Sequence, residues 1–108
     1  MAYDEVLAER VRERLGDETA VAEKRMFGGL SFLSQGRLVV AVSGDDLLVR
    51  VGPERVRDAL ARSGARPAVM GSRTMRGWVR AAGETLDDAA LDHWITTALT
   101  YTATLPAE

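Results

Sequence analysis

The sequence contains no cysteine, and it has one histidine and three prolines in 108 residues. Without cysteine there is no disulfide, no thiolate nucleophile and no cysteine-type zinc site, so packing alone must stabilise the fold. The apolar runs are much shorter than the ~20 residues that cross a bilayer. The N-terminus is acidic and amphipathic, unlike a secretory signal or a transit peptide. We therefore expect a cytoplasmic protein with no membrane segment.

The net charge is also small, −2 with a pI near 5.4, which weighs against nucleic-acid binding as the main activity. The charges are unevenly distributed, however. Residues 59–83 contain five arginines and no acid, and four acids follow between Glu84 and Asp92. The arginines are Arg62, Arg66, Arg73, Arg76 and Arg80. We expect these two blocks to neutralise each other.

The hydrophobic content of 46% against 28% charged residues predicts a globular chain, and its length fits a single domain over residues 1–108. Helical spacing of apolar residues predicts a helix over residues 2–15, which Gly16 ends. Short apolar runs separated by turn residues then predict four strands joined by tight hairpins. These strands are expected at residues 20–27, 30–33, 37–42 and 47–51.

Gly52 and Pro53 mark the end of a strand and the start of a helix, predicted over residues 53–63. Residues 66–67 are expected to be extended, residues 75–81 form a further strand, and a capping-box pattern at Thr85 begins a helix that lasts until Pro106. The order α-β-β-β-β-α-β-α predicts an α+β fold with two layers, an antiparallel β-sheet meander and helices at both termini. The first and last helices should share one face of the sheet.

The second face of the sheet is predicted to be partly apolar too. Strand alternation assigns Leu38, Val40 and Val42 to the core, and Val39, Ala41 and Leu48 to the second face. The helix at 53–63 has a narrow apolar stripe that does not cover all of this face. Since an uncovered apolar sheet implies a partner, we expect a homodimer.

The segment Met26-Phe27-Gly28-Gly29 allows three interpretations. A phosphate-binding loop requires a following helix, but a strand follows here. A bulge or sharp bend that turns Met26 and Phe27 into the core is favoured, because glycine weakens a strand unless the backbone needs it. A surface that contacts a partner is the third interpretation.

Arg76, Trp78 and Arg80 alternate along the strand at 75–81 and should share one side of it. Such a set fits a ring packed under guanidinium stems, a protein interface or a surface that stacks nucleic-acid bases. With Arg50, these residues form the predicted interaction surface. Direct nucleic-acid binding through the arginine-rich segment 62–80 is the alternative.

No catalytic, cofactor or metal site is predicted. His93 would need Asp88 and Asp92 as co-ligands for zinc, but it points about 100° away from Asp92 on the helix. Ser31, Ser34 and Ser43 do not lie in a nucleophile-elbow pattern. We therefore expect a protein that is not an enzyme.

Three sequence blocks resemble the TfoX N-terminal domain family, also called TfoX/Sxy-like: EKRMFGGLSF at residues 23–32, LVRVG at 48–52 and RTMRGWV at 73–79. The resemblance implies a two-layer α/β domain with an antiparallel sheet. Its signature residues, taken as structural, are Met26, Phe27, Gly28, Gly29, Gly52 and Gly77.

Family members that act in bacterial competence are regulators that work with a transcription activator and carry an additional C-terminal domain. This chain stops at Glu108, so we expect a stand-alone member. The family offers no agreed catalytic residues. We therefore expect a small module that acts through protein contacts, as a regulator of the competence or transcription type.

Overall fold

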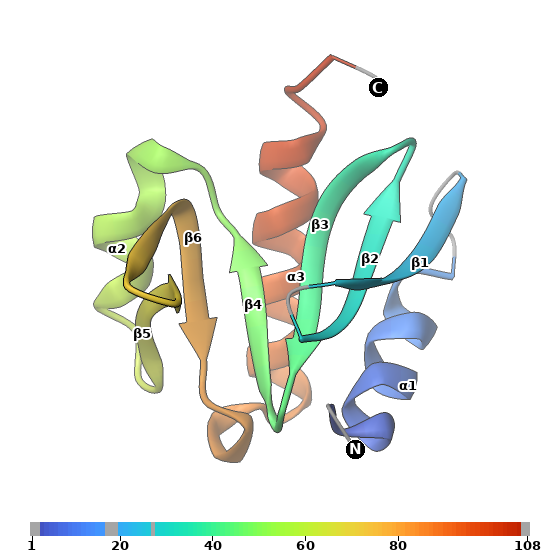
Figure 1. Cartoon of the computed structure of the whole chain (residues 1–108), viewed down its shortest axis with the longest axis horizontal. Helices are drawn as coiled ribbons and strands as arrows, with labels where there is room; N and C mark the ends of the chain where they lie inside the picture. Colours follow the sequence, from blue (N-terminus) through green and yellow to red (C-terminus); the bar gives the residue numbers. More distant parts are fainter. Residues whose placement is uncertain (1–2, 17–19, 27, 107–108) are drawn as a thin grey trace.

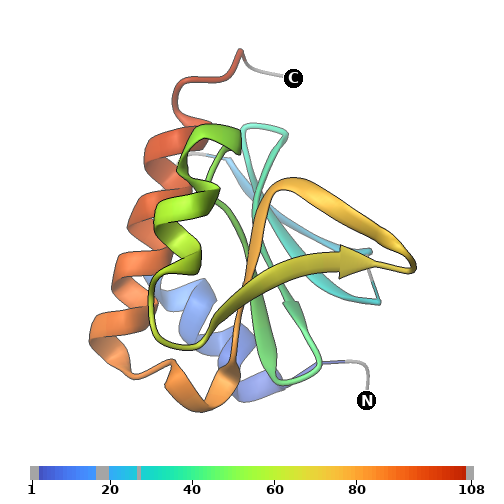
Figure 2. The same cartoon turned by 90° about the vertical axis from the view of Figure 1, so that its left-hand side faces the viewer.

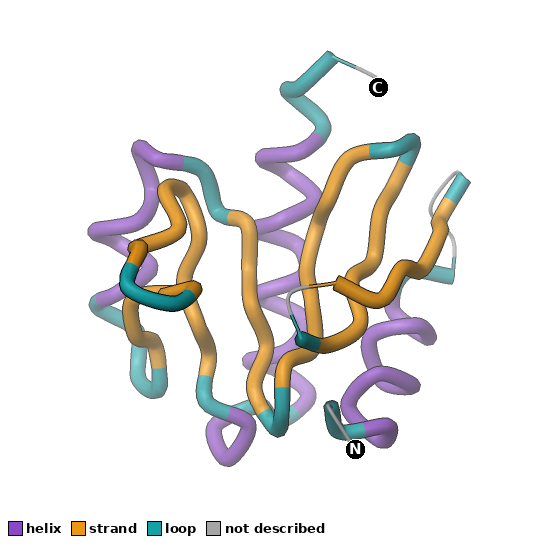
Figure 3. Tube along the Cα trace, viewed as in Figure 1, coloured by secondary structure: helices purple, strands orange, loops and turns teal. Residues whose placement is uncertain are grey.

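The computed structural model describes residues 3–16, 20–26 and 28–106. Its helices are α1 (Glu5–Arg14), α2 (Val56–Leu60) and α3 (Asp88–Thr102), with short 3-10 turns η1 (Pro53–Arg55) and η2 (Gly83–Thr85) (Figures 1 and 3). Its strands are β1 (Val21–Met26), β2 (Gly29–Ser34), β3 (Arg37–Ser43), β4 (Asp46–Arg50), β5 (Ala65–Met70) and β6 (Arg73–Ala81). The predicted α+β class with an antiparallel sheet and helices near both ends is confirmed.

The sheet adds one strand to the predicted order. Its strands run β1-β2-β3-β4-β6-β5, and every neighbouring pair is antiparallel. The added strand β5 contains Pro67 and has one buried residue, Ala68, so it has no alternating pattern to detect. Proline is tolerated there because β5 lies at the edge of the sheet.

All three helices pack on one face of the sheet (Figure 2). The predicted sharing of this face by α1 and α3 is confirmed, and α2 joins them through Ala59. Trp94 of α3 and Phe32 of β2 are the largest fully buried side chains in this core. Asp87 accepts a hydrogen bond from the Ala90 N–H at 2.8 Å, so it caps α3 in place of Thr85.

A bulge in β3 reverses part of the predicted alternation. Phe32 pairs with Val40 but Leu33 pairs with Leu38, so Val39 is an extra residue without an opposite partner. Val39 therefore packs in the core beside Val40, and Leu38 turns to the second face. The prediction was wrong for these two residues because it assumed an unbroken period of two.

The second face has its own apolar cluster. It contains Ala41, Leu48, Ala68 and Trp78, with Leu38 and Met75 packed against them, and we call it the second-face cluster. Its four central residues are at most 8% exposed. The apolar surface that was expected to be open is therefore largely covered within the chain itself.

The predicted neutralisation between the arginine block and the acids of α3 does not occur for Asp88 and Asp92. Asp88 pairs with Arg10 at 3.2 Å and with Arg14 at 3.0 Å, and Asp92 pairs with Arg14 at 2.5 Å. Helix α1 supplies both arginines because it packs beside the start of α3. No helix in the described part of the chain has both the length and the apolarity needed to cross a membrane.

Candidate interaction surface

Trp78 is buried on the second face of the sheet. Its side chain is 8% exposed and packs in the second-face cluster with Leu48. Trp78 lies opposite Arg50 of β4 in the sheet, and Arg80 lies opposite Leu48. The tryptophan is thus a packing residue of the second face. Of the three interpretations, this is nearest to a ring packed under guanidinium stems.

Arg80 is held in an internal network rather than presented to solvent. Its Nε donates to Asp46 Oδ2 at 2.7 Å, and the Gly83 N–H donates to Asp46 Oδ1 at 2.8 Å. Arg66 of β5 pairs with the same carboxylate at 3.3 Å. Burial alone raises the pKa of Asp46, but the bonds from Gly83 and Arg80 and the charge of Arg66 outweigh burial and lower this pKa below its ordinary value. Asp46 therefore joins β4, β5 and β6.

Arg50 is half-buried at the end of β4. Its Nη1 donates to the Leu38 carbonyl at 3.2 Å, and its guanidinium carbon lies 5.8 Å from the centre of the Tyr101 ring. A guanidinium at this distance from an aromatic face is attracted to it. Arg50 thus connects the sheet to the C-terminal half of α3.

Gly77 separates Arg76 from the other predicted site residues. Its φ of +84° is favourable only for glycine, and its carbonyl accepts from both the Val51 and Gly52 N–H groups at 2.9 Å. This bulge interrupts the alternation, so Met75 joins Trp78 in the second-face cluster. Arg76 is exposed and lines two surface hollows instead.

The signature glycines are explained by the backbone. A side chain on Gly52 would lie 2.5 Å from the Tyr101 ring, and one on Gly29 would lie 1.9 Å from the Val42 carbonyl oxygen. Gly28 takes a φ of +71° at a turn with open space around it. These contacts support the interpretation of a sharp bend.

The other two signature residues of this segment do not share that explanation. Met26 is half-buried and lines a shallow hollow with Tyr3 and Arg25. Among the described residues it does not belong to either apolar cluster, so the prediction that it turns into the core is wrong. Phe27 lies outside the described residues.

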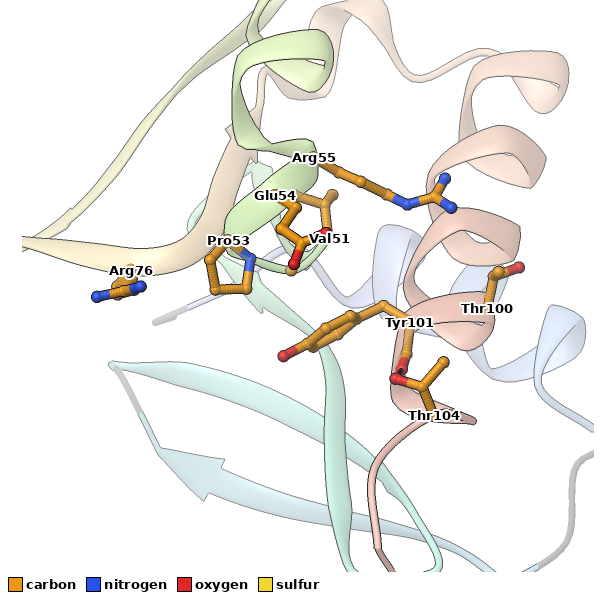
Figure 4. A pocket seen from close by; sticks show the side chains of 9 residues that line it. Val51, Pro53, Glu54, Arg55, Arg76, Thr100, Tyr101 and Thr104 are labelled. Atoms are coloured by element: carbon orange, nitrogen blue, oxygen red, sulfur yellow. Dashed lines mark hydrogen bonds between the residues drawn. The ribbon is translucent and has the colours of Figure 1, made fainter.

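The first of the two hollows beside Arg76 is the Tyr101 pocket, with a volume of about 520 Å³. Arg55 extends toward Thr100 of α3, and Arg76 lies on the opposite side, beyond Pro53 (Figure 4). Glu54 and Thr104 also line it. Its polar groups come from η1, β6 and α3, which are far apart in the sequence.

The second hollow, which we call the α2 groove, lies between α2 and the β5–β6 hairpin and has a volume of about 490 Å³. Its walls are mostly apolar: Pro53, Val56, Leu60, Pro67, Met75 and Trp78, with Thr74, Arg76 and Gly77 completing it. Pro53 and Arg76 line both hollows. The two hollows therefore form one continuous surface.

Charge is concentrated around this surface. Residues 50–83, which we call the basic lobe, contain eight arginines and two acids, a net charge of +6. The remainder of the chain has six basic and fourteen acidic residues, a net charge of −8. The net charge of the whole chain is small only because the positive charge of the basic lobe offsets the negative charge of the remainder.

Most arginines of the basic lobe have no acidic partner. Only Arg66 and Arg80 form ion pairs within the part of the chain that the structure describes, both with Asp46. Arg62 instead lies over the Trp94 ring at 5.6 Å. Arg73 and Arg76 are exposed on the hairpin. The lobe therefore presents positive charge that the fold does not use.

Sequence reasoning missed Tyr101, Pro53 and Arg55 as parts of this surface. Tyr101 belongs to a helix that is remote in sequence, and only its packing against Gly52 brings it here. The sequence feature that could have indicated this surface is the pair Gly52 and Gly77, which lie in the LVRVG and RTMRGWV blocks. Both glycines mark places where another chain segment approaches closely.

His93 lies in a smaller hollow with Arg62 and Asp58, and Arg55 lines both this hollow and the Tyr101 pocket. Burial, with the charge of Arg62, lowers the pKa of His93. No group of three His, Cys, Asp or Glu side chains that could hold a metal occurs among the described residues.

The comparisons with known proteins give a family but no individual relative. Searches of curated proteins and of solved structures found no match. The family model of the TfoX N-terminal domain matches residues 13–101. This range includes all three sequence blocks and every signature glycine. The chain therefore belongs to the TfoX N-terminal domain family.

Proposed function

We propose that this protein is a non-enzymatic, cytoplasmic regulatory module that acts by binding another macromolecule through the basic lobe. The observation that carries this proposal is the unpaired positive charge around two joined hollows. Elsewhere, the arginines of α1 are used for internal ion pairs. Charge that a fold leaves unpaired beside an apolar surface is available to a partner. Family membership supports a regulatory role, in competence or in transcription.

The chemistry of the hollows supports binding rather than catalysis. The Tyr101 pocket contains hydroxyl, guanidinium and carboxylate groups, but its threonines are not placed beside a histidine. A nucleophile needs an adjacent base to react. We therefore assign the lobe a binding role.

Self-association remains part of the proposal, but through another surface. Two basic lobes that faced each other would bring net charges of +6 together, which opposes their contact. Outside the lobe, Val6 of α1 is 69% exposed and is the apolar side chain there that a dimer contact could cover. Light scattering after size exclusion distinguishes a dimer from a monomer of 11.7 kDa.

Direct nucleic-acid binding is the second candidate, because a lobe with a net charge of +6 attracts phosphate. It predicts affinity that falls steeply as salt rises. Titration of single- and double-stranded probes at low salt tests it. An absence of binding there would remove this candidate.

A charge-reversal experiment tests the proposed surface. The variant Arg73→Glu/Arg76→Glu changes two exposed residues of β6, and the control Lys24→Glu/Arg25→Glu makes the same charge change on β1, at the opposite edge of the sheet. Each protein is used to capture partners from extract of the source cell, with quantitative mass spectrometry. We expect partners that the control retains and the β6 variant loses. Equal capture by both variants would contradict the assignment of the basic lobe.

A further inference from the structure

We propose that the α2 groove is a docking site for an acidic chain segment of a partner protein, whose apolar side chains enter the groove while its acids contact the arginines around it. This inference rests on the proposed function as a binding module. It adds the class of partner and the place where that partner binds.

The walls of the groove favour apolar side chains. Val56 and Leu60 come from one side of α2, and Pro67 and Met75 come from the hairpin. Val56 and Leu60 pack only partly against the core, so each leaves apolar surface toward the groove. A volume of about 490 Å³ accommodates several side chains of a peptide. Such a groove with few polar groups is typical of peptide-binding surfaces.

The apolar surface continues beyond the groove along the hairpin. Val69 pairs with Thr74, which lines the groove, and cross-strand partners point to the same side of a sheet. Val69 is 49% exposed on that side, whereas its neighbour Met70, which is 43% exposed, pairs with Arg73 and points to the opposite side. They are two of the three large apolar side chains that are exposed in the described structure. An extended or helical segment in the groove would therefore also cover Val69.

The charges around the groove select an acidic occupant. Arg76 lines the groove, and Arg73 is exposed near the tip of the hairpin; neither has an acidic partner among the residues described. Charge complementarity across an interface sets the choice of partner and speeds association. A neutral apolar segment would leave these charges unused, and a basic segment would be repelled.

The groove fits a protein segment better than nucleic acid or a second copy of the lobe. Proteins that bind single strands stack bases on exposed aromatic rings, whereas Trp78, the aromatic residue of the groove, is 8% exposed. Phosphates also gain nothing from the aliphatic walls. The basic lobe of a second copy would be repelled, because both lobes are positively charged.

The experiment selects binders for the full chain from a random displayed library of 12-residue peptides. We expect enriched peptides with net negative charge and at least two large apolar residues. Replacing those apolar residues by serine in a synthetic peptide should weaken binding at least tenfold, as measured by fluorescence anisotropy. Enrichment of basic or purely polar peptides, or no enrichment, would overturn the proposal.

Matched variants of the protein locate the binding. Thr74→Glu places an acid at the groove, and Thr96→Glu places one on an exposed position of α3 outside it. We expect the selected peptide to bind Thr74→Glu at least tenfold more weakly and Thr96→Glu unchanged. Equal loss, or no loss, in both variants would overturn the groove assignment.

A conservative variant provides a second check. Val56→Thr retains the shape of the side chain but places a hydroxyl in the groove. Methyl chemical shifts of Met75 and Leu60 should move on peptide addition in the wild type and move less in this variant. Salt-sensitive binding of DNA without any peptide binding would show that the lobe binds nucleic acid, which rejects this inference but retains the basic lobe as the binding surface.

Discussion

Arginine side chains have different roles at the two ends of the sheet. At the end covered by α1, Arg12 pairs with Glu9 and with Glu23 of β1, and Arg10 and Arg14 pair with acids of α3. At the other end, the basic lobe leaves Arg73 and Arg76 without an acid among the described residues. Arginine therefore connects elements of the fold at the first end and remains available at the second.

This difference separates structural residues from the residues that we propose bind a partner. A side chain that bridges two elements should contribute to the free energy of unfolding and little to binding. An unpaired one should do the reverse. Asp46 is the informative exception in the region of the lobe, because it fixes β5 and β6 to β4 and so holds the proposed binding surface in place.

The largest expected effect comes from Gly29→Ala at the first end. A Cβ at this position lies 1.9 Å from the Val42 carbonyl oxygen, which belongs to the paired strand β3 and cannot move away independently. We expect a loss of at least ~3 kcal/mol of folding free energy. Urea denaturation followed by circular dichroism measures it.

The control is Gly28→Ala, where the φ of +71° disfavours alanine but no atom lies within 4 Å. Its cost should be about 1 kcal/mol. Equal losses for the two glycines would show that backbone conformation, and not the close approach of β2 to β3, requires both residues.

The next largest effect is expected from Asp46→Asn. The neutral amide leaves Arg80 without its ion pair and weakens the bond from the Gly83 N–H. We expect a loss of about 2 kcal/mol at pH 7, measured by urea denaturation. The exposed neighbour Asp45 forms no ion pair in the described structure, so Asp45→Asn is the control, with an expected change below about 0.5 kcal/mol.

The pH dependence of this loss identifies its origin. The pKa of Asp46 is lower in the folded protein than its ordinary value of 3.8. Its ionised form therefore stabilises the fold above that ordinary value, and this contribution disappears as the pH falls through the folded pKa. The difference between wild type and Asp46→Asn should shrink between pH 5 and strongly acid solution. A difference that does not change with pH would attribute the effect to packing.

The smallest effect contrasts the two ends directly. Arg14→Gln removes the pairs with Asp88 and Asp92, whereas Arg76→Gln removes none within the described chain. We expect a loss of about 1 kcal/mol for the first and less than about 0.5 kcal/mol for the second. Thermal unfolding at low and high salt checks both, because salt screens only the first effect. A larger loss for Arg76→Gln would remove the distinction between the two ends.

The sequence by itself determined the fold class and most elements. The hairpin turns at residues 34–36 and 43–46 and the long apolar stripe of α3 are local patterns with a fixed period. They predicted four successive strands and both major helices. Strand β5 was missed because an edge strand with Pro67 has little periodicity to detect.

The sequence also singled out Gly29 and Gly52, which the backbone requires, and predicted Arg76 as part of an interaction surface; the structure leaves Arg76 exposed. Only the tertiary structure decided which side chains meet there. The bulge at Val39 places Val39 in the core and Leu38 on the second face, the reverse of the predicted arrangement. The bulge at Gly77 separates Arg76 from Trp78. Tyr101 of α3 lies 49 residues beyond Gly52 in the chain and reaches the site by contact with it. Such placements depend on where distant segments cross, which no local period encodes.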